Sequence, residues 1–102
     1  MVRIPTHRAP PHPGELLREE FLEPLEMTQT HLAAAIGVPF QRVNDLVNGR
    51  RGITPDTALR LAKLFQTTPD LWLNMQRACD VYGAYRKGAE ALKKIRPVRG
   101  AA

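Results

Sequence analysis

The stretch from Ala33 to Gly52, AAAIGVPFQRVNDLVNGRRG, contains the end of one helical pattern and the start of another. Gly37 follows the first pattern, and glycine readily takes the left-handed conformation that closes a helix. Pro39 suits the first turn of the next helix, where its missing N–H costs no hydrogen bond. That helix is expected to reach about Val47, before an Asn-Gly turn signal. Two helices joined by so short a corner containing glycine predict a helix-turn-helix.

The packing expected across this corner separates a buried side from a polar side. Ala33 lies four residues before Gly37, so its small side chain lets the two helices approach closely. Val43 and Leu46 share one face of the second helix and are expected to pack against the first helix. This packing leaves four polar residues on the other faces of the second helix, namely Gln41, Arg42, Asn44 and Asp45.

These polar residues have the chemistry that reads DNA bases. Gln and Asn pair bidentately with adenine and Arg with guanine, and a recognition helix presents its N-terminal residues to base edges. Candidate phosphate contacts flank them, because free backbone N–H groups at helix N-termini attract anions. Thr28 and Gln29 lie at such an end, and Asn48, Arg50 and Arg51 follow the second helix. Phosphate contacts set the position of the protein on DNA, not its sequence preference.

The N-terminal third of the chain predicts an arm followed by two helices. Residues 1–13 contain four prolines and are expected to form an extended arm. The first helix is expected over residues 14–23, because Pro24 disfavours helix in the residue before it. The hydroxyl of Thr28 can accept a free backbone N–H, which predicts a helix over residues 29–36.

Two further helices are expected in the second half of the chain. Thr54-Pro55 and Thr68-Pro69 each combine a capping residue with a proline suited to the first turn. The earlier helix should reach about Phe65, whereas Gly83 and Gly88 should weaken the end of the later one. The later helix carries an apolar stripe made of Leu71, Trp72, Met75, Cys79 and Tyr82.

The length and the charge of the chain limit its class. Its 102 residues suggest one domain, over residues 14–86, between the arm and a basic tail over residues 87–102. No segment alternates as a strand does, so the expected fold is all-α with five helices, and a short sixth is left open. The net charge of +5 indicates a polyanion or an acidic partner. The tail is either a nucleic-acid contact or a solvated end.

Several classes of function find little support in the sequence. The single cysteine excludes an internal disulfide and fits a cytoplasmic location. No apolar run has the length of a membrane span, and no secretory signal follows the N-terminal charge. His7, His12, His31 and Cys79 match no compact zinc spacing, and no nucleophile is paired with a base. We therefore expect no metal, no cofactor and no enzymatic activity.

Two segments resemble the HigA-type antitoxins of bacterial toxin–antitoxin modules, which are small members of the lambda-repressor-like helix-turn-helix class. HPGELLREEFLEPLEMTQTHLAAAIGV, residues 12–38, resembles the opening of that family. GRRGITPDTALRLAKLFQTTPDLWLNMQRACDVYGAYR, residues 49–86, resembles its second half. TPDLWLNMQ, residues 68–76, is the more specific part, because ordinary repressors of this class lack it.

The resemblance implies a homodimeric, non-enzymatic repressor. Such a protein would bind palindromic double-stranded DNA at its own operon and neutralise a HigB-type toxin, a ribosome-dependent mRNA endonuclease. An orphan regulator without a toxin partner is the alternative, and a helix-turn-helix that serves only as a scaffold is another. The family's DNA contacts fall by motif position on Gln29, Gln41, Arg42 and Asn48, to which the physical argument adds Thr28, Asn44 and Arg51.

Two more expectations concern the backbone at two helix ends and the interface of the dimer. Glu26 and Gln66 stand where the family commonly has glycine just after a helix, so both are expected to take a positive φ angle. Trp72, Met75 and Tyr82 are expected in the core or in a two-fold interface built from the last long helix and the segment that follows it. Such a dimer would place its recognition helices about one DNA turn apart, roughly 34 Å.

Overall fold

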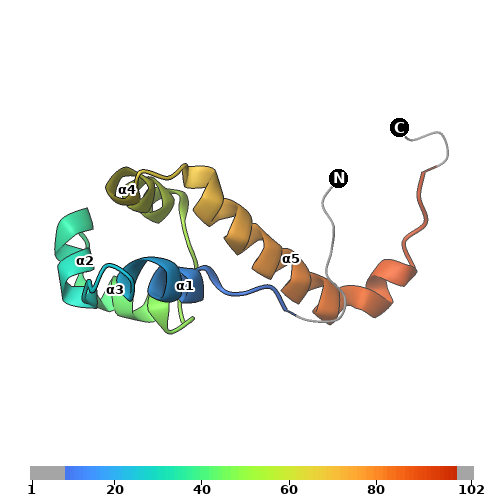
Figure 1. Cartoon of the computed structure of the whole chain (residues 1–102). Helices are drawn as coiled ribbons and strands as arrows, with labels where there is room; N and C mark the ends of the chain where they lie inside the picture. The colour runs from blue at the N-terminus through green and yellow to red at the C-terminus, as the bar shows by residue number, and fades with distance from the viewer. Residues whose placement is uncertain (1–8, 99–102) are drawn as a thin grey trace.

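The computed structural model describes residues 9–98 and shows helices gathered at one end of a long helix, α5 (Figure 1). No strand occurs in this described range, which confirms the all-α prediction with five helices. Residues 1–8 of the expected arm and residues 99–102 of the expected tail lie outside the described residues. The helical segments are α1 Pro13–Leu16, the π-helical η1 Leu17–Leu22, α2 Gln29–Ile36, α3 Phe40–Val47, α4 Pro55–Phe65 and α5 Pro69–Lys93.

The helices begin where the capping residues predict. The hydroxyls of three threonines each accept a backbone N–H from three residues further on, at distances of 3.0 to 3.3 Å. His12 plays the same part for α1, because its Nδ1 accepts the N–H of Gly14 at 2.9 Å. The capping threonines are Thr28 for α2, Thr54 for α4 and Thr68 for α5.

Several of the expected helix boundaries are wrong. The helix expected over residues 14–23 begins at Pro13, ends at Leu22 and is divided into α1 and η1. Pro39 is the N-cap of α3 with an extended backbone (ψ 146°), so the helix begins one residue later than predicted, at Phe40. Helix α5 continues through Gly83 and Gly88 to Lys93 instead of weakening there. The residues around these glycines are mostly good helix formers, which offsets a cost of about 1 kcal/mol per glycine. No separate sixth helix follows within the described residues.

Two non-glycine residues have positive φ angles, as predicted, one in the turn after η1 and one at the end of α4. Glu26 has φ 51° and Gln66 has φ 56°, and Gln66 is the left-handed C-cap of α4. The left-handed region costs a residue with a Cβ roughly 1–2 kcal/mol. The chain therefore keeps both corners despite an unfavourable residue type at each.

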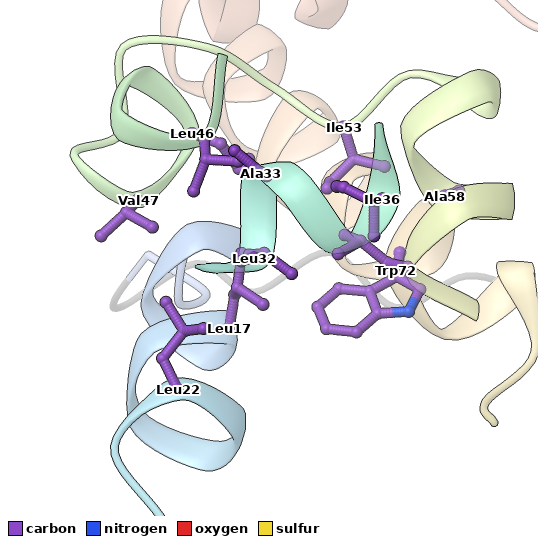
Figure 2. Packing of buried hydrophobic residues seen from close by; sticks show 12 residues of the cluster. Leu17, Leu22, Leu32, Ala33, Ile36, Leu46, Val47, Ile53, Ala58 and Trp72 are labelled. Carbon is purple, nitrogen blue, oxygen red and sulfur yellow. The ribbon is translucent and has the colours of Figure 1, made fainter. Parts of the chain in front are cut away.

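The hydrophobic core lies between the short helices and the start of α5 (Figure 2). Trp72 is its largest fully buried side chain, and its ring centroid lies 5.3 Å from that of Phe21 and 6.4 Å from that of Phe65. The indole Nε1 donates to Thr67 Oγ1 at 2.9 Å, so burial leaves no unpaired donor there. The core residues are Leu17, Leu22, Leu32, Ala33, Ile36, Val43, Leu46, Val47, Ile53, Ala58, Leu61 and Trp72.

Helix α1 packs closely on the backbone of α3. Gly14 is buried, and a Cβ atom placed on it would overlap the carbonyl oxygen of Leu46. Only glycine allows this approach. The contact fixes α3 from the side opposite to its polar residues.

Helix α5 extends well beyond the core (Figure 1). Trp72 is its one buried residue in the described range, whereas Met75, Cys79 and Tyr82 are half-buried. No helix of residues 9–98 combines the length and the apolar character of a membrane span. The far half of α5 carries a shallow apolar groove, lined by Val81, Ala84, Tyr85, Gly88, Ala91 and Leu92.

Candidate nucleic-acid interface

The corner between α2 and α3 has the predicted geometry. Gly37 is left-handed with φ 72°, and the N–H of Val38 donates back to the carbonyl of Ala33 at 3.0 Å. Arg60 of α4 braces the corner, since its Nη1 donates to the carbonyl of Ile36 at 2.7 Å. The direction of α3 is therefore fixed both by its own turn and by α4.

Helix α3 has a buried side and a polar side, as the sequence predicts. Val43 and Leu46 are each 2% exposed and belong to the core. Gln41 and Asn48 are exposed, and the side chain of Arg42 is 31% exposed. The polar side chains of α3 are thus available to a ligand from solvent.

The N-termini of α2 and α3 both offer backbone N–H groups. The first N–H groups of a helix have no partner within it and carry a partial positive charge. Thr28 Oγ1 accepts from the third residue of α2, which leaves the N–H of Gln29 available. Pro39 makes no side-chain capping bond, so the first N–H groups of α3 are available as well. Two helix ends suited to phosphate therefore flank the polar residues.

Asn44 connects the polar residues of α2, α3 and the following loop. Its Nδ2 donates to Gln29 Oε1 at 3.0 Å, and its Oδ1 accepts from Arg50 at 3.0 Å. Asp45 Oδ1 accepts from Gln41 Nε2 at 2.8 Å and from Arg50 Nε at 3.3 Å. Gln41 keeps its carbonyl oxygen and a second amide N–H, which is the pair that a bidentate contact with adenine requires.

Arg42 is held by Asp56 of α4 and not by the residues that contact Asn44 and Asp45. Its Nη1 donates to Asp56 Oδ2 at 3.2 Å, and the same oxygen accepts from Arg60 Nε at 3.0 Å. Asp56 is 58% exposed, so this ion pair contributes little stability. It does limit the directions in which Arg42 can point, and the remaining guanidinium N–H groups stay available for a guanine.

The structure brings most of the predicted site residues into one region. Asn48 Nδ2 donates to the carbonyl of Asn44 at 2.9 Å, which attaches it to the hydrogen-bonded residues described above. Arg51 joins the same region through its backbone, because its N–H donates to the carbonyl of Asp45 at 3.2 Å, while its side chain is exposed. Contact with DNA stays a prediction for all seven residues: Thr28, Gln29, Gln41, Arg42, Asn44, Asn48 and Arg51.

Sequence reasoning missed three residues that shape this region. Phe40 is the first residue of α3 and 47% exposed, although it is large and apolar. Its place directly after Pro39, at the N-terminal end of the helix expected to read bases, was the available signal. Asp56 and Gln76 act over long range, and Gln76 Oε1 of α5 accepts the N–H of Ile53 at 2.7 Å. Hydrogen bonds between residues so far apart in the sequence cannot be predicted from a local pattern.

The described histidines and the cysteine have other places in the fold, whereas His7 lies outside the described residues. His12 caps α1, and His31 is exposed on α2. Cys79 Sγ lies 3.3 Å from the carbonyl oxygen of Pro11, and burial, followed by the charge of Asp80, raises the pKa of the thiol. Residues 9–98 contain no group of three or more side chains able to hold a metal ion.

Three comparisons with known proteins agree with this geometry. The Helix-turn-helix family model matches residues 18–72. The Virulence-associated protein I of Dichelobacter nodosus is 50% identical over 69% of this chain, and the match spans 65% of its own length, just under two thirds. The Antitoxin HigA-1 of Vibrio cholerae is 39% identical over 91% of this chain and 88% of its own length. The Pseudomonas aeruginosa antitoxin HigA, solved with the higBA promoter, is 38% identical, covers 87% of this chain and 98% of its own, and has a TM-score of 0.84.

The two HigA proteins match most of the chain, 91% and 87% of it. The family model covers more than half of the 102 residues. This family is non-enzymatic. The chain therefore belongs to the HigA family of antitoxins, within the lambda-repressor-like helix-turn-helix class.

Proposed function

We propose that this protein is a homodimeric antitoxin that binds a palindromic operator, represses its own operon and neutralises a HigB-type mRNA endonuclease. The main support for DNA binding is the position of Gln41 and Arg42. Both lie at the N-terminal end of α3, on its polar side, beside two helix ends with available N–H groups. Base readout and phosphate contact can therefore occur together at one surface.

The charge and the family support DNA as the partner. The net charge of +5 attracts a polyanion and speeds its encounter with the protein. Arg50 and Arg51 lie in the loop after α3 and suit phosphate contacts that position the helix. The related antitoxin HigA of Pseudomonas aeruginosa was solved with its higBA promoter, which supports the same class of ligand for this chain.

The dimer is proposed to form through α5. This helix extends beyond the core, and its far half presents the apolar groove that includes Tyr85 and Leu92. Leu92 is 48% exposed in the single chain, so pairing with a second copy would cover it. A two-fold axis through α5 would point two α3 helices at half-sites roughly 34 Å apart.

Neutralisation of a HigB-type toxin rests on membership of the family. We name no toxin-contacting residues. A cytoplasmic location follows from the proposed ligands, an operator and a ribosome-dependent endonuclease. The alternative, an orphan regulator, keeps the DNA-binding role and has no toxin partner. Co-expression with the gene next to this one separates the two, since an antitoxin restores growth that the neighbouring product arrests and an orphan regulator does not.

Selection of bound sequences from random duplexes tests the DNA-binding proposal. The expected result is an inverted repeat whose half-site centres lie about 10 base pairs apart, bound by one dimer. The same protein should form a dimer by analytical ultracentrifugation at micromolar concentration. If no sequence preference is recovered, the proposed repressor function is contradicted, and a helix-turn-helix that serves only as a scaffold is favoured.

A further inference from the structure

We propose that Phe40 reads the C5-methyl group of a thymine in the major groove. This inference rests on the proposed DNA-binding function and adds a specificity-determining residue to it. The structure supplies three independent supports, which are the exposure of the ring, its place on α3 and the chemistry of its surroundings.

Phe40 is exposed without a structural reason in the single chain. Its side chain is 47% exposed, and it does not belong to the core or to the partly buried residues packed against it. The other apolar residues of α3 show the contrast, since Val43 and Leu46 are 2% exposed and Val47 is 9% exposed. A single exposed apolar residue is common on protein surfaces, so its location must carry the argument.

The location of Phe40 is the end of the helix that meets the bases. Pro39 is the N-cap with an extended backbone, so Phe40 is the first residue of α3. Residues three and four apart are neighbours on a helix, which places Phe40 beside both Val43 and Asn44, at the edge where the buried side of α3 meets its polar side. Asn44 is hydrogen-bonded to Gln29 of α2 at 3.0 Å, so this edge adjoins the proposed α2 contact. N-terminal residues of a recognition helix are the ones that reach base edges.

The chemistry around Phe40 selects the methyl group among the features of the groove. Gln41 and Arg42 carry hydrogen-bond donors that suit adenine and guanine, whereas the phenyl ring has neither a donor nor an acceptor. The major-groove edges of the four bases offer one apolar group, the C5-methyl of thymine. Contact with this methyl group would cover the exposed ring and add sequence information that the polar neighbours do not read.

The test replaces each thymine of the selected duplex by deoxyuridine, which removes only the methyl group. For the wild-type protein we expect one symmetry-related thymine per half-site at which this exchange weakens binding about fourfold per half-site, the value for one buried methyl-sized group. For Phe40→Ala the same exchange should change the dissociation constant less than 1.5-fold. Leu59→Ala removes another exposed apolar side chain, 61% exposed on α4, and should keep the wild-type response.

The outcomes distinguish failure of the proposed role of Phe40 from failure of the proposed DNA-binding function. Equal binding of the thymine and deoxyuridine duplexes by the wild type, or an unchanged thymine effect in Phe40→Ala, would overturn the role of Phe40 while leaving DNA binding intact. A wild-type protein without sequence preference on any duplex would overturn the proposed function itself. Because the exchange in DNA is measured on the wild type, the test does not depend on the folding of a variant.

Discussion

Arg42 on α3 donates a hydrogen bond to Asp56 at the start of α4, with 3.2 Å between Nη1 and Oδ2. The two residues lie 14 positions apart, so the contact ties the proposed recognition helix to the next helix of the fold. The same carboxylate accepts from Arg60, which also holds the carbonyl of Ile36 at the corner. Asp56 therefore links the orientation of a proposed base-reading side chain to the geometry of the helix-turn-helix.

Replacing Asp56 by Asn should reduce discrimination between DNA sequences rather than stability. The change replaces a charged acceptor of Arg42 by a neutral one, which weakens the hold on Arg42, and it removes a negative charge near the proposed phosphate contacts, so binding to a scrambled duplex should strengthen. The free energy of unfolding should change by less than 1 kcal/mol, because the pair is exposed. The ratio of the two dissociation constants, measured by fluorescence anisotropy on selected and scrambled duplexes, should fall. A ratio equal to that of the wild type would argue against an orienting role.

Arg42 and Arg51 should differ in what they contribute to binding. Arg42→Ala should cost about 1–3 kcal/mol on the selected duplex and far less on a scrambled one, because it removes a base contact. Arg51→Ala should weaken both duplexes alike, because phosphate contacts carry no sequence information directly. Each variant serves as the control for the other in the same titration. Equal losses on both duplexes for Arg42→Ala would refute its assignment to a base.

Gly14→Ala should lower the free energy of unfolding by about 1–3 kcal/mol, the range for an added group in a tightly packed site. The new Cβ would overlap the carbonyl oxygen of Leu46 and push α1 away from α3. Gly83→Ala is the matched control, since open space surrounds Gly83 within α5 and alanine favours helix by about 1 kcal/mol. Urea denaturation followed by circular dichroism measures both. Two variants of equal stability would contradict the close approach.

Gln66→Gly should raise the free energy of unfolding by about 0.5–1 kcal/mol. Glycine relieves the positive φ angle of 56° at the end of α4, and the greater freedom of the unfolded chain offsets part of that gain. Lys63→Gly, inside the same helix, should lower it by about 1 kcal/mol. Thermal unfolding of the two variants beside the wild type gives the comparison. A lower midpoint for Gln66→Gly would show that the side chain makes a compensating contact.

The sequence was informative wherever the controlling signal is local. Thr28, Thr54 and Thr68 predicted the starts of three helices, and Gly37 predicted the corner, because capping and left-handed geometry depend on neighbouring residues. The burial of Val43 followed from helical spacing. These signals were sufficient for the fold and for the polar side of α3.

The remaining features depend on contacts between distant residues. The bond from Arg42 to Asp56 and the bond from Ile53 to Gln76 form only after the helices have packed. The π-helical turn Leu17–Leu22 was not foreseen, because an apolar pattern does not separate it from an α-helix. Pro39 was misplaced by one position, since proline fits both the N-cap and the first turn.

The most direct test of the account is the salt dependence of binding to the selected duplex. If α3 enters the groove with Arg51 on a phosphate, the logarithm of the binding constant should fall linearly with the logarithm of salt concentration, by about 0.9 per phosphate contacted. Arg51→Ala should make that slope shallower by about 0.9 for each copy in the dimer. A response that is flat for the wild type, or a protein that binds no duplex at low salt, would contradict the account.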